Sequence, residues 1–140
     1  LLKNQMQIQT NSPFFVANGD LITDFSPKKM LKRHIDTSSD LTIASTTIFH
    51  RSNYGVLRYS ETGAIYEVSE KPRIPERIYA GISLINFELV EQLQRLSYLE
   101  MTDFINSFCK IKKVMDFHID EYWMDLGTIE NLNEAKQISK

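Results

Sequence analysis

Two aspartates stand where the chain could hold a metal ion. Asp20 directly follows an apolar run and Gly19, and Asp125 lies between a second apolar run and Gly127. Open α/β sheets bind ligands at the carboxyl ends of their strands, so a carboxylate at Asp20 is well placed for chemistry. Magnesium takes oxygen ligands and often binds through one or two carboxylates plus substrate phosphates. Asp20 is therefore a candidate magnesium ligand, and Asp125 is a second carboxylate in a similar setting.

A glutamate and a lysine form the second group of candidates. In Glu70-Lys71-Pro72, the proline favours an extended conformation at Lys71, which would project the lysine side chain. A lysine so placed can meet a phosphate as a point charge, and a glutamate can accept hydrogen bonds from sugar hydroxyls. This tripeptide is thus a candidate sugar-phosphate contact.

Each candidate also has a plainer explanation. Asp20 lies in an Asn-Gly-Asp stretch that is ordinary turn chemistry, and Asp125 could simply cap a helix. Glu70 and Lys71 could form a solvated salt bridge in a loop, which contributes little to stability. Taken singly, these residues leave both alternatives open.

The elements that must position these residues alternate between strand and helix. The apolar run 13–17 lacks polar alternation, as in a strand buried on both faces of a parallel sheet. A Glu-Thr-Gly turn at 61–63 predicts a hairpin, and a loop with Pro72 and Pro75 follows it. The expected strands are 13–17, 41–49, 55–59, 64–68, 80–86 and 113–118. The expected helices are 27–36, 87–96, 129–138, and one that Thr102 or Asp103 caps and that ends at Phe108.

This alternation predicts an α/β fold: a Rossmann-like layered structure with a mostly parallel mixed sheet and a local β-hairpin. The 140 residues, 42% of them hydrophobic, are enough for one globular domain, so one domain covering 1–140 is the starting hypothesis. The chain begins with Leu1 rather than methionine and enters an apolar run without a preceding turn. We therefore expect a partial domain from which an upstream segment is missing.

Composition excludes several classes of function. The formal net charge is −2 and the basic residues are dispersed, so no basic stripe is available for nucleic acid. Cys109 is the single cysteine, which rules out an internal disulfide or a thiolate metal cluster. No apolar run approaches the roughly 20 residues that span a bilayer, and no signal peptide is evident. We expect a cytoplasmic protein with small-molecule or protein partners and no membrane association.

Five segments, taken together and in order, are far more specific than any one of them. They are Asn18-Gly19-Asp20, Tyr54-Gly55-Val56, Glu70-Lys71-Pro72, Ala80-Gly81-Ile82 and Trp123-Met124-Asp125-Leu126-Gly127. The set resembles the sugar-1-phosphate nucleotidyltransferase family, which includes glucose-1-phosphate thymidylyltransferases and mannose-1-phosphate guanylyltransferases. The resemblance covers nearly the whole chain from about Phe14 onward and corresponds to the carboxyl-terminal portion of such an enzyme.

The resemblance implies a role for each matching position. Asp20 and Asp125 would hold the Mg2+ that bridges the phosphates of the two substrates, and Lys71 would contact the sugar 1-phosphate. Three further residues would line the sugar pocket: Glu70, Gly55 and Gly81. The two glycines would do so because their backbone must approach the hydroxyls without an intervening side chain.

The implied reaction is attack by a sugar 1-phosphate on a nucleoside triphosphate, which yields a nucleotide sugar and pyrophosphate. Members of the family open with a glycine-rich loop that cradles the triphosphate, whereas the glycines of this chain are scattered singly. We therefore expect the chain alone to be inactive and its longer parent to be the enzyme. Guanine is the favoured base from the detailed resemblance, and exposed apolar sheet edges would favour a homo-oligomer.

Two alternatives remain. A metal-dependent glycosyltransferase also places aspartate after a buried strand, but it usually carries an Asp-x-Asp pair, and the next aspartate after Asp20 is Asp24. A non-catalytic relic could instead keep sugar-phosphate binding without turnover. Transfer of sugar from a nucleotide sugar to an acceptor would favour the glycosyltransferase, and loss of sugar-phosphate binding by the parent would favour the relic.

Overall fold

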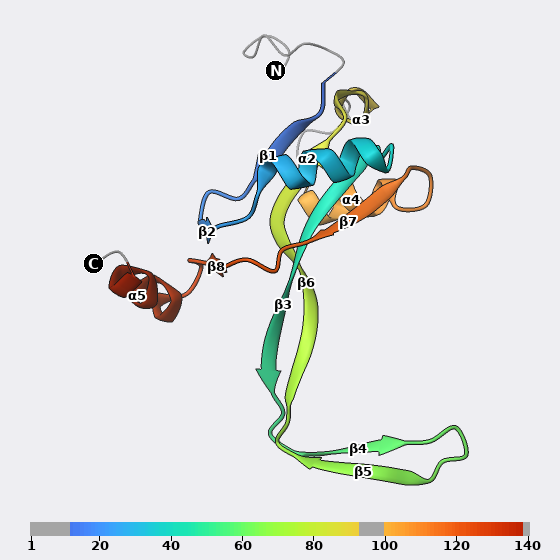
Figure 1. Ribbon diagram of the computed structural model, residues 1–140, viewed down its shortest axis with the longest axis vertical. Helices are drawn as coiled ribbons and strands as arrows, with labels where there is room; N and C mark the ends of the chain where they lie inside the picture. Colours follow the sequence, from blue (N-terminus) through green and yellow to red (C-terminus); the bar gives the residue numbers. More distant parts are fainter. Residues whose placement is uncertain (1–11, 93–99, 139–140) are drawn as a thin grey trace. The chain divides into compact units, whose positions relative to one another are not determined.

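The computed structural model describes residues 12–92 and 100–138, and the chain divides into two compact units. The first unit consists of residues 1–45 and 79–140, and the second consists of residues 46–78. Strands β3 (Leu41–Arg51) and β6 (Arg73–Ile85) have residues in both units (Figure 1). The segment expected as a local hairpin, 55–68, thus lies within the second compact unit.

The first unit contains a sheet of four strands in the order β1-β6-β3-β7. The outer strands are β1 (Phe14–Ala17) and β7 (Val114–His118). β1 pairs antiparallel with β6, with Phe14 opposite Ile85, and β7 pairs parallel with β3, with Val114 opposite Leu41. These pairings place the chain segments of residues 14–17 and 114–118 at opposite edges of one sheet.

Helices cover both faces of this sheet, because alternate strand residues enter different cores. Met30 of α2 (Pro27–Asp36) packs in one core with Ala44 and Ile82. Leu41 and Ile85 belong to the other core, which also takes side chains from α3 (Phe87–Gln92) and α4 (Met101–Phe108). The expected α/β layered class is confirmed.

Local sequence signals set both ends of α2. The Ser26 hydroxyl accepts a hydrogen bond from the Lys29 N–H at 3.4 Å, and Pro27 occupies the first turn, where its missing N–H is not needed. At the other end, the Ser38 and Ser39 N–H groups donate to the carbonyls of residues 35 and 34. This pattern, with Ser38 at φ +48°, is a Schellman ending.

A second, two-stranded sheet joins distant parts of the sequence. β2 (Leu21–Thr23) pairs antiparallel with β8 (Trp123–Asp125), and helix α5 (Ile129–Ile138) follows β8 (Figure 1). The sequence analysis predicted no pairing between these two segments, because each strand has only three residues and its partner lies about a hundred residues away.

The second unit is built on the antiparallel hairpin of β4 (Gly55–Tyr59) and β5 (Ile65–Glu70). Leu57 lies opposite Val68, and both side chains are exposed. A salt bridge of 3.2 Å joins Arg58 to Glu67, which lies directly opposite it in the ladder. The expected hairpin is confirmed, with its second strand extended to Glu70.

Other element predictions fared unevenly. The helices 27–36 and 129–138 have the expected bounds, and the end expected for the helix 87–96 lies outside the described residues. Pro75 lies within β6 rather than in a loop, and α4 begins at Met101, with Glu100 rather than Thr102 or Asp103 at its N-cap. Glu100 makes no side-chain capping bond, so capping preferences misplaced this start.

The sequence analysis expected a mostly parallel sheet, but most of the observed strand pairs are antiparallel. The pairings β1–β6, β2–β8 and β4–β5 are antiparallel, whereas β3–β7 is parallel. β1 is an edge strand whose residues alternate between partly buried and exposed, so the prediction that it is buried on both faces was wrong. An apolar run can therefore stand at a sheet edge when one of its faces remains uncovered.

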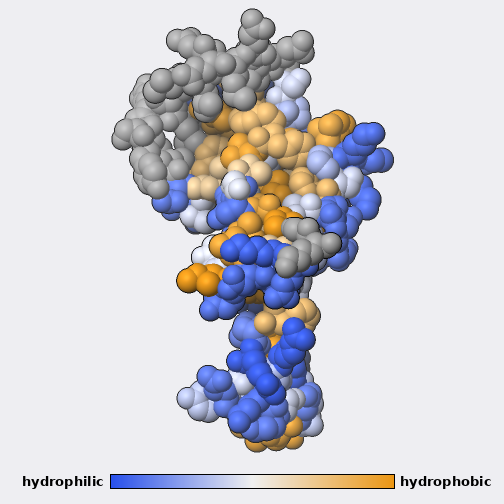
Figure 2. All heavy atoms as spheres, turned by 90° about the vertical axis from the view of Figure 1, so that its left-hand side faces the viewer, coloured by the Kyte–Doolittle hydropathy of each residue, from blue (hydrophilic) through white to orange (hydrophobic). Residues whose placement is uncertain are grey.

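Large apolar side chains remain accessible on the surface of the first unit. Figure 2 shows apolar areas beside polar ones on one face of the molecule. Side chains that are more than a third exposed include Phe15, Ile22 and Ile129. Among the described residues, no helix combines the length and apolar character needed to cross a membrane.

Candidate active site

The β2–β8 ladder brings the backbones of the two candidate aspartates together. Asp125 lies directly opposite Leu21 in the register, and the Leu126 N–H donates to the Asp20 carbonyl at 2.8 Å. Asp20 is exposed, in the turn before β2, and Asp125 is partly buried at the end of β8. Two residues more than a hundred positions apart thus become neighbours across a ladder.

The Asp125 carboxylate is held in a tight local turn. Its Oδ1 accepts a hydrogen bond of 2.7 Å from the Gly127 N–H, and its backbone carbonyl accepts one of 2.6 Å from the Asn131 side chain. A Cβ atom on residue 127 would lie only 2.7 Å from Asp125 Oδ1. Glycine at 127 therefore leaves room for the carboxylate in this position.

Gly81 approaches the same region from β6. Its φ is +74°, and its carbonyl accepts a hydrogen bond of 2.9 Å from the Asn18 N–H. A Cβ atom at residue 81 would lie 2.9 Å from Asn18 Nδ2 and 3.1 Å from Leu21 Cδ1. Both the backbone conformation and the packing require glycine, so Gly81 fits closely beside the turn that carries Asp20.

Three residues that support this arrangement were not predicted as site residues: Gly127, Asn131 and Trp123. The Asp-x-Gly spacing from 125 to 127 is the usual signal of a side chain that hydrogen-bonds the backbone two residues on, and it could have identified Gly127. Trp123 donates its indole N–H to the Ala80 carbonyl at 2.9 Å. No local signal reveals that bond, because its partners lie 43 positions apart.

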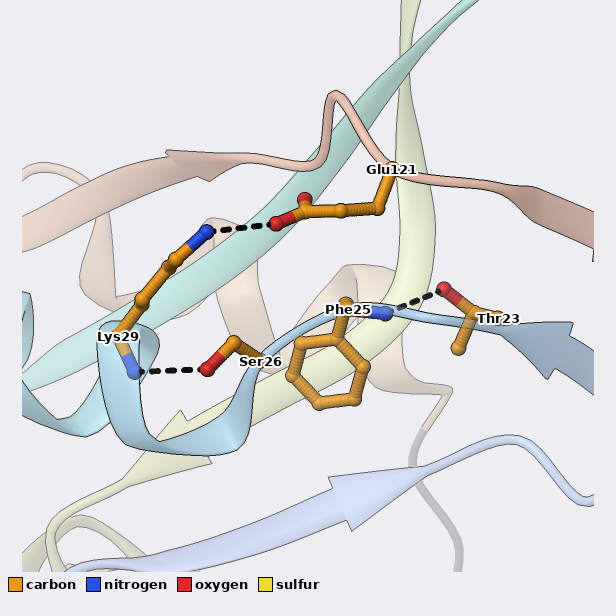
Figure 3. Close-up of polar contacts among 5 residues, drawn as sticks. All are labelled: Thr23, Phe25, Ser26, Lys29 and Glu121. Carbon is orange, nitrogen blue, oxygen red and sulfur yellow. Dashed lines mark hydrogen bonds and ion pairs between the residues drawn. The ribbon is translucent and has the colours of Figure 1, made fainter.

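Contacts beyond the ladder fasten the segment before β8 to the segment between β2 and α2. The Thr23 hydroxyl and the Asp24 N–H both donate to the Tyr122 carbonyl, at 2.8 and 3.0 Å. Figure 3 shows the Glu121 carboxylate directed at the Lys29 ammonium, 2.9 Å away. The hydrogen bond between the two side chains lowers the pKa of Glu121 and raises the pKa of Lys29, and their Coulomb attraction acts in the same direction.

The remaining candidates lie together in the second unit. Gly55 pairs with Glu70 across the β4–β5 ladder, and a Cβ atom at residue 55 would lie 3.3 Å from Glu70 Oε2. The Ser52 N–H donates to the Pro72 carbonyl at 3.0 Å, which joins the two ends of the hairpin. Glycine at 55 thus gives the Glu70 carboxylate its space.

Lys71 departs from the predicted conformation. Its φ is +45°, in the left-handed region, so the expectation that Pro72 makes Lys71 extended was wrong. A non-glycine residue in this region costs roughly 1–2 kcal/mol. Lys71 itself is exposed, as a residue that meets a ligand must be.

Two other polar side chains serve the core instead. His34 is 3% exposed and is hydrogen-bonded to Thr42 and Asn86, so it is a packed core residue. Tyr79 packs against the core that contains Leu41 and Ile85, and its hydroxyl is 3.0 Å from that of Ser83. Burial raises the pKa of Tyr79, partly offset by this hydrogen bond.

The donor set beside the ladder is chemically suited to a hard divalent cation. Two carboxylates, Asp20 and Asp125, offer oxygen atoms, and among the described residues no group of three or more His, Cys, Asp or Glu side chains is placed to hold a metal. A closed cage of protein ligands is therefore absent from this part of the chain. Mg2+ usually keeps several waters and binds through one or two carboxylates plus substrate phosphates, so the set fits Mg2+.

Comparison with known proteins gives consistent matches. The family model described as Nucleotidyl transferase matches residues 1–140. A mannose-1-phosphate guanylyltransferase catalytic subunit beta of Drosophila melanogaster is 28% identical over 120 residues, which are 84% of this chain and 32% of that protein. A glucose-1-phosphate adenylyltransferase of Clostridium perfringens (strain 13 / Type A) is 31% identical over 133 residues, which cover 86% of this chain and 34% of that protein.

The fold matches a solved structure as well. HddC from Yersinia pseudotuberculosis has a TM-score of 0.69 and 22% identity, with 98% of this chain and 58% of that chain covered. The likeness concerns the fold and confirms the expected Rossmann-like class. The chain spans about a third of the length of the curated relatives it matches.

Proposed function

Since the chain belongs to the nucleotidyl transferase family, we propose that the whole protein transfers a nucleotidyl group from a nucleoside triphosphate to a sugar 1-phosphate. Its products are a nucleotide sugar and pyrophosphate. Relatives that act on mannose 1-phosphate with guanylyl transfer and on glucose 1-phosphate with adenylyl transfer support this reaction. Because these relatives differ in base and sugar, guanine and mannose are not favoured by the comparisons alone.

The observation that carries the proposal is the β2–β8 ladder. It makes neighbours of Asp20 and Asp125 through the Leu21–Asp125 pair and the Leu126-to-Asp20 hydrogen bond. A ladder of three residue pairs with one carboxylate at the end of β8 and another in the turn just before β2 is a specific arrangement. We propose that these two residues hold Mg2+, which supplies charge neutralisation at the phosphates when bound.

The residues of the second unit act on the sugar 1-phosphate in this proposal. Lys71 places a positive charge on the phosphate, and Glu70 accepts hydrogen bonds from sugar hydroxyls. Gly55 exposes backbone groups where a side chain would interfere, as its close approach to Glu70 indicates. In the first unit, we propose the same role for Gly81, which lies close to Asn18. The chain thus contributes positioning and charge rather than a nucleophile.

The chemical step is an in-line substitution at the α-phosphorus. An oxygen of the sugar 1-phosphate forms the new P–O bond while the bond from the α-phosphorus to the bridging oxygen of the β-phosphate breaks. The electron pair of that bond leaves with pyrophosphate. No redox change occurs and no covalent enzyme intermediate is required.

A crystal of the full chain soaked in Mn2+ tests the metal assignment, because the anomalous signal of manganese locates the ion. We expect one ion bound by Asp20 and Asp125 carboxylate oxygens. Asp20→Asn and Asp125→Asn should each remove the ion and, in the longer protein, lower turnover by about 100-fold or more. Asp24→Asn is the matched control, because Asp24 follows β2 and its backbone N–H donates to Tyr122.

Full activity in either asparagine variant would sink the metal assignment. Sugar transfer from a nucleotide sugar to an acceptor, without pyrophosphate chemistry, would instead make the protein a glycosyltransferase. Absence of sugar 1-phosphate binding by the longer protein would favour a relic without turnover. We further propose that the protein acts in the cytoplasm, with a sugar 1-phosphate and a nucleoside triphosphate as its partners. We also propose that it forms a homo-oligomer, which light scattering would test.

A further inference from the structure

Trp123 joins the strand that carries Asp125 to the strand that carries Gly81. Its indole N–H donates to the Ala80 carbonyl at 2.9 Å, and Ala80 is fully buried. The ring packs against the core that contains Met30 and Ala44, and it is itself partly buried. Tryptophan has a single polar group, an N–H donor, so this bond fixes the orientation of the ring as well as its depth.

The bond lies close in sequence to a candidate site residue on each side, Asp125 on one side and Gly81 on the other. Asp125 is two positions after Trp123 in β8, so their side chains leave the strand on the same face. On the other side, Ala80 directly precedes Gly81, whose carbonyl accepts the Asn18 N–H. A movement of Trp123 away from Ala80 would therefore move Asp125 relative to Gly81.

Three hydrogen bonds close a ring through three segments of the chain. The Trp123 side chain binds the segment at residues 80–81, the Asn18 N–H binds that segment to the turn at 18–20, and the Leu126 N–H binds that turn to the segment at 123–126. Each segment is thus fixed to both of the others. A side chain supplies one of these bonds and the backbone supplies the other two.

We infer that the Trp123 indole N–H is a positioning group for the metal site, which sets where Asp125 stands relative to Asp20 and Gly81. The inference rests on the proposed function of the two aspartates as metal ligands. It assigns the effect to one hydrogen bond, beyond the apolar packing of the ring. Partners that orient a metal ligand commonly change metal affinity by about 10- to 100-fold when they are removed.

An isosteric replacement separates the hydrogen bond from the packing. Truncation of the ring would leave a cavity and destabilise the core, which would obscure the result. In 3-benzothienylalanine a sulfur atom takes the place of the N–H while the bicyclic shape is kept. Trp123 is the only tryptophan of the sequence, so biosynthetic replacement of tryptophan in the full chain alters this position alone.

The experiment compares the tryptophan chain with the benzothienyl chain by two readouts. Mn2+ affinity, followed by the electron paramagnetic resonance of the free ion, should fall about 10-fold or more in the benzothienyl chain. Hydrogen exchange of the Leu126 and Asn18 amides should become faster, because both donate within the ring of bonds. The Thr37 amide, which donates to Arg33 at the end of α2, serves as the unaffected control.

The outcomes separate this inference from the proposed function. Unchanged Mn2+ affinity in the benzothienyl chain, with loss of binding in Asp125→Asn, would overturn the positioning role and leave the metal assignment standing. Unchanged exchange at Leu126 and Asn18 would overturn it as well. Retention of Mn2+ by Asp125→Asn would refute the metal assignment, whereas faster exchange confined to those two amides would still support the link through Trp123.

Discussion

Gly127 shows how a single missing side chain can shape a site. A Cβ atom on residue 127 would lie only 2.7 Å from Asp125 Oδ1, and the same oxygen accepts a hydrogen bond from the Gly127 N–H. The φ of Gly127 is not positive, unlike that of Gly81. Alanine at 127 therefore meets no backbone strain, and its methyl group conflicts with the carboxylate alone.

We predict that Gly127→Ala separates metal binding from stability. The methyl group should displace the Asp125 carboxylate and lower Mn2+ affinity by about 10-fold or more. The free energy of unfolding should stay the same or rise by about 0.4–1 kcal/mol, because alanine reduces the conformational entropy of the unfolded chain. Titration with Mn2+ and urea unfolding measure the two quantities.

Gly19→Ala is the matched control for this prediction. Gly19 adjoins the other candidate ligand, Asp20, and a Cβ atom there would meet nothing within 4 Å. Mn2+ affinity should remain at the wild-type value in this variant. Equal affinity in Gly127→Ala and Gly19→Ala would show that the Asp125 carboxylate does not need its observed position to bind metal.

Among the elements, the β2–β8 ladder depends on contacts just outside its three residue pairs. The Lys29–Glu121 ion pair connects helix α2 to the segment that leads into β8, 92 positions away (Figure 3). A second exposed pair, Lys32 with Asp36, lies within α2 itself. The two pairs have similar chemistry, but Lys29–Glu121 spans distant elements, so their loss should have different consequences.

We predict that Glu121→Gln loosens the ladder locally. Exchange of the Asp24 amide, which donates to Tyr122, should rise by up to about fivefold, because an exposed ion pair contributes little and the backbone bonds remain. Asp36→Asn should leave that amide unchanged, since the Lys32–Asp36 pair does not reach β8. Equal exchange at Asp24 in wild type and Glu121→Gln would show that the ion pair does not support the ladder.

The contribution of this pair should depend on pH in a defined direction. The folded pKa of Glu121 is lowered from 4.5, so its stabilisation is present above pH 4.5 and is lost as the pH falls through the lowered value. The folded pKa of Lys29 is raised from 10.5, so its stabilisation is present below pH 10.5 and is lost above the raised value. The difference in exchange between wild type and Glu121→Gln should therefore be constant near neutrality and vanish in strong acid.

Local signals in the sequence predicted the elements whose ends are set locally. Ser26 and Pro27 fixed the start of α2, and the turn at 61–63 fixed the hairpin. The β2–β8 ladder was missed, since its partners are far apart and a three-residue strand has no visible period. The start of β6 was missed because Pro75 suggested a loop, although this proline lies in the strand.

In the candidate site too, local signals were visible in the sequence, whereas contacts between distant residues were not. The types of residue at Asp20 and Asp125 indicated metal binding, but only the register of the ladder places their backbones side by side. The Trp123-to-Ala80 bond depends on tertiary packing, and the left-handed conformation of Lys71 runs against the local preference that Pro72 sets. The candidate ligands could therefore be proposed from the sequence, whereas the contacts that support them could not.

At the scale of the whole molecule, the 140-residue sequence offers groups for a metal ion and a sugar phosphate but no glycine-rich loop for a triphosphate. The five glycines stand singly, so no glycine-rich loop is available to surround a triphosphate with backbone N–H groups. The curated relatives are about three times as long as the matched region. The contacts proposed for Asp20, Asp125 and Lys71 concern metal and sugar phosphate, and they leave the base of the nucleotide without a partner in the proposal.

We therefore predict that the 140-residue chain binds Mn2+ but releases no pyrophosphate when it is given Mg2+, a sugar 1-phosphate and nucleoside triphosphates. Binding and turnover separate because the carboxylates lie within this sequence, whereas catalysis also requires a held triphosphate. A coupled pyrophosphate assay measures turnover, with Asp125→Asn as the blank. A chain that also supplies a triphosphate-binding loop should be active with the same substrates. Mg2+-dependent pyrophosphate release above the Asp125→Asn blank would contradict this prediction, because it would mean that these residues alone position both substrates.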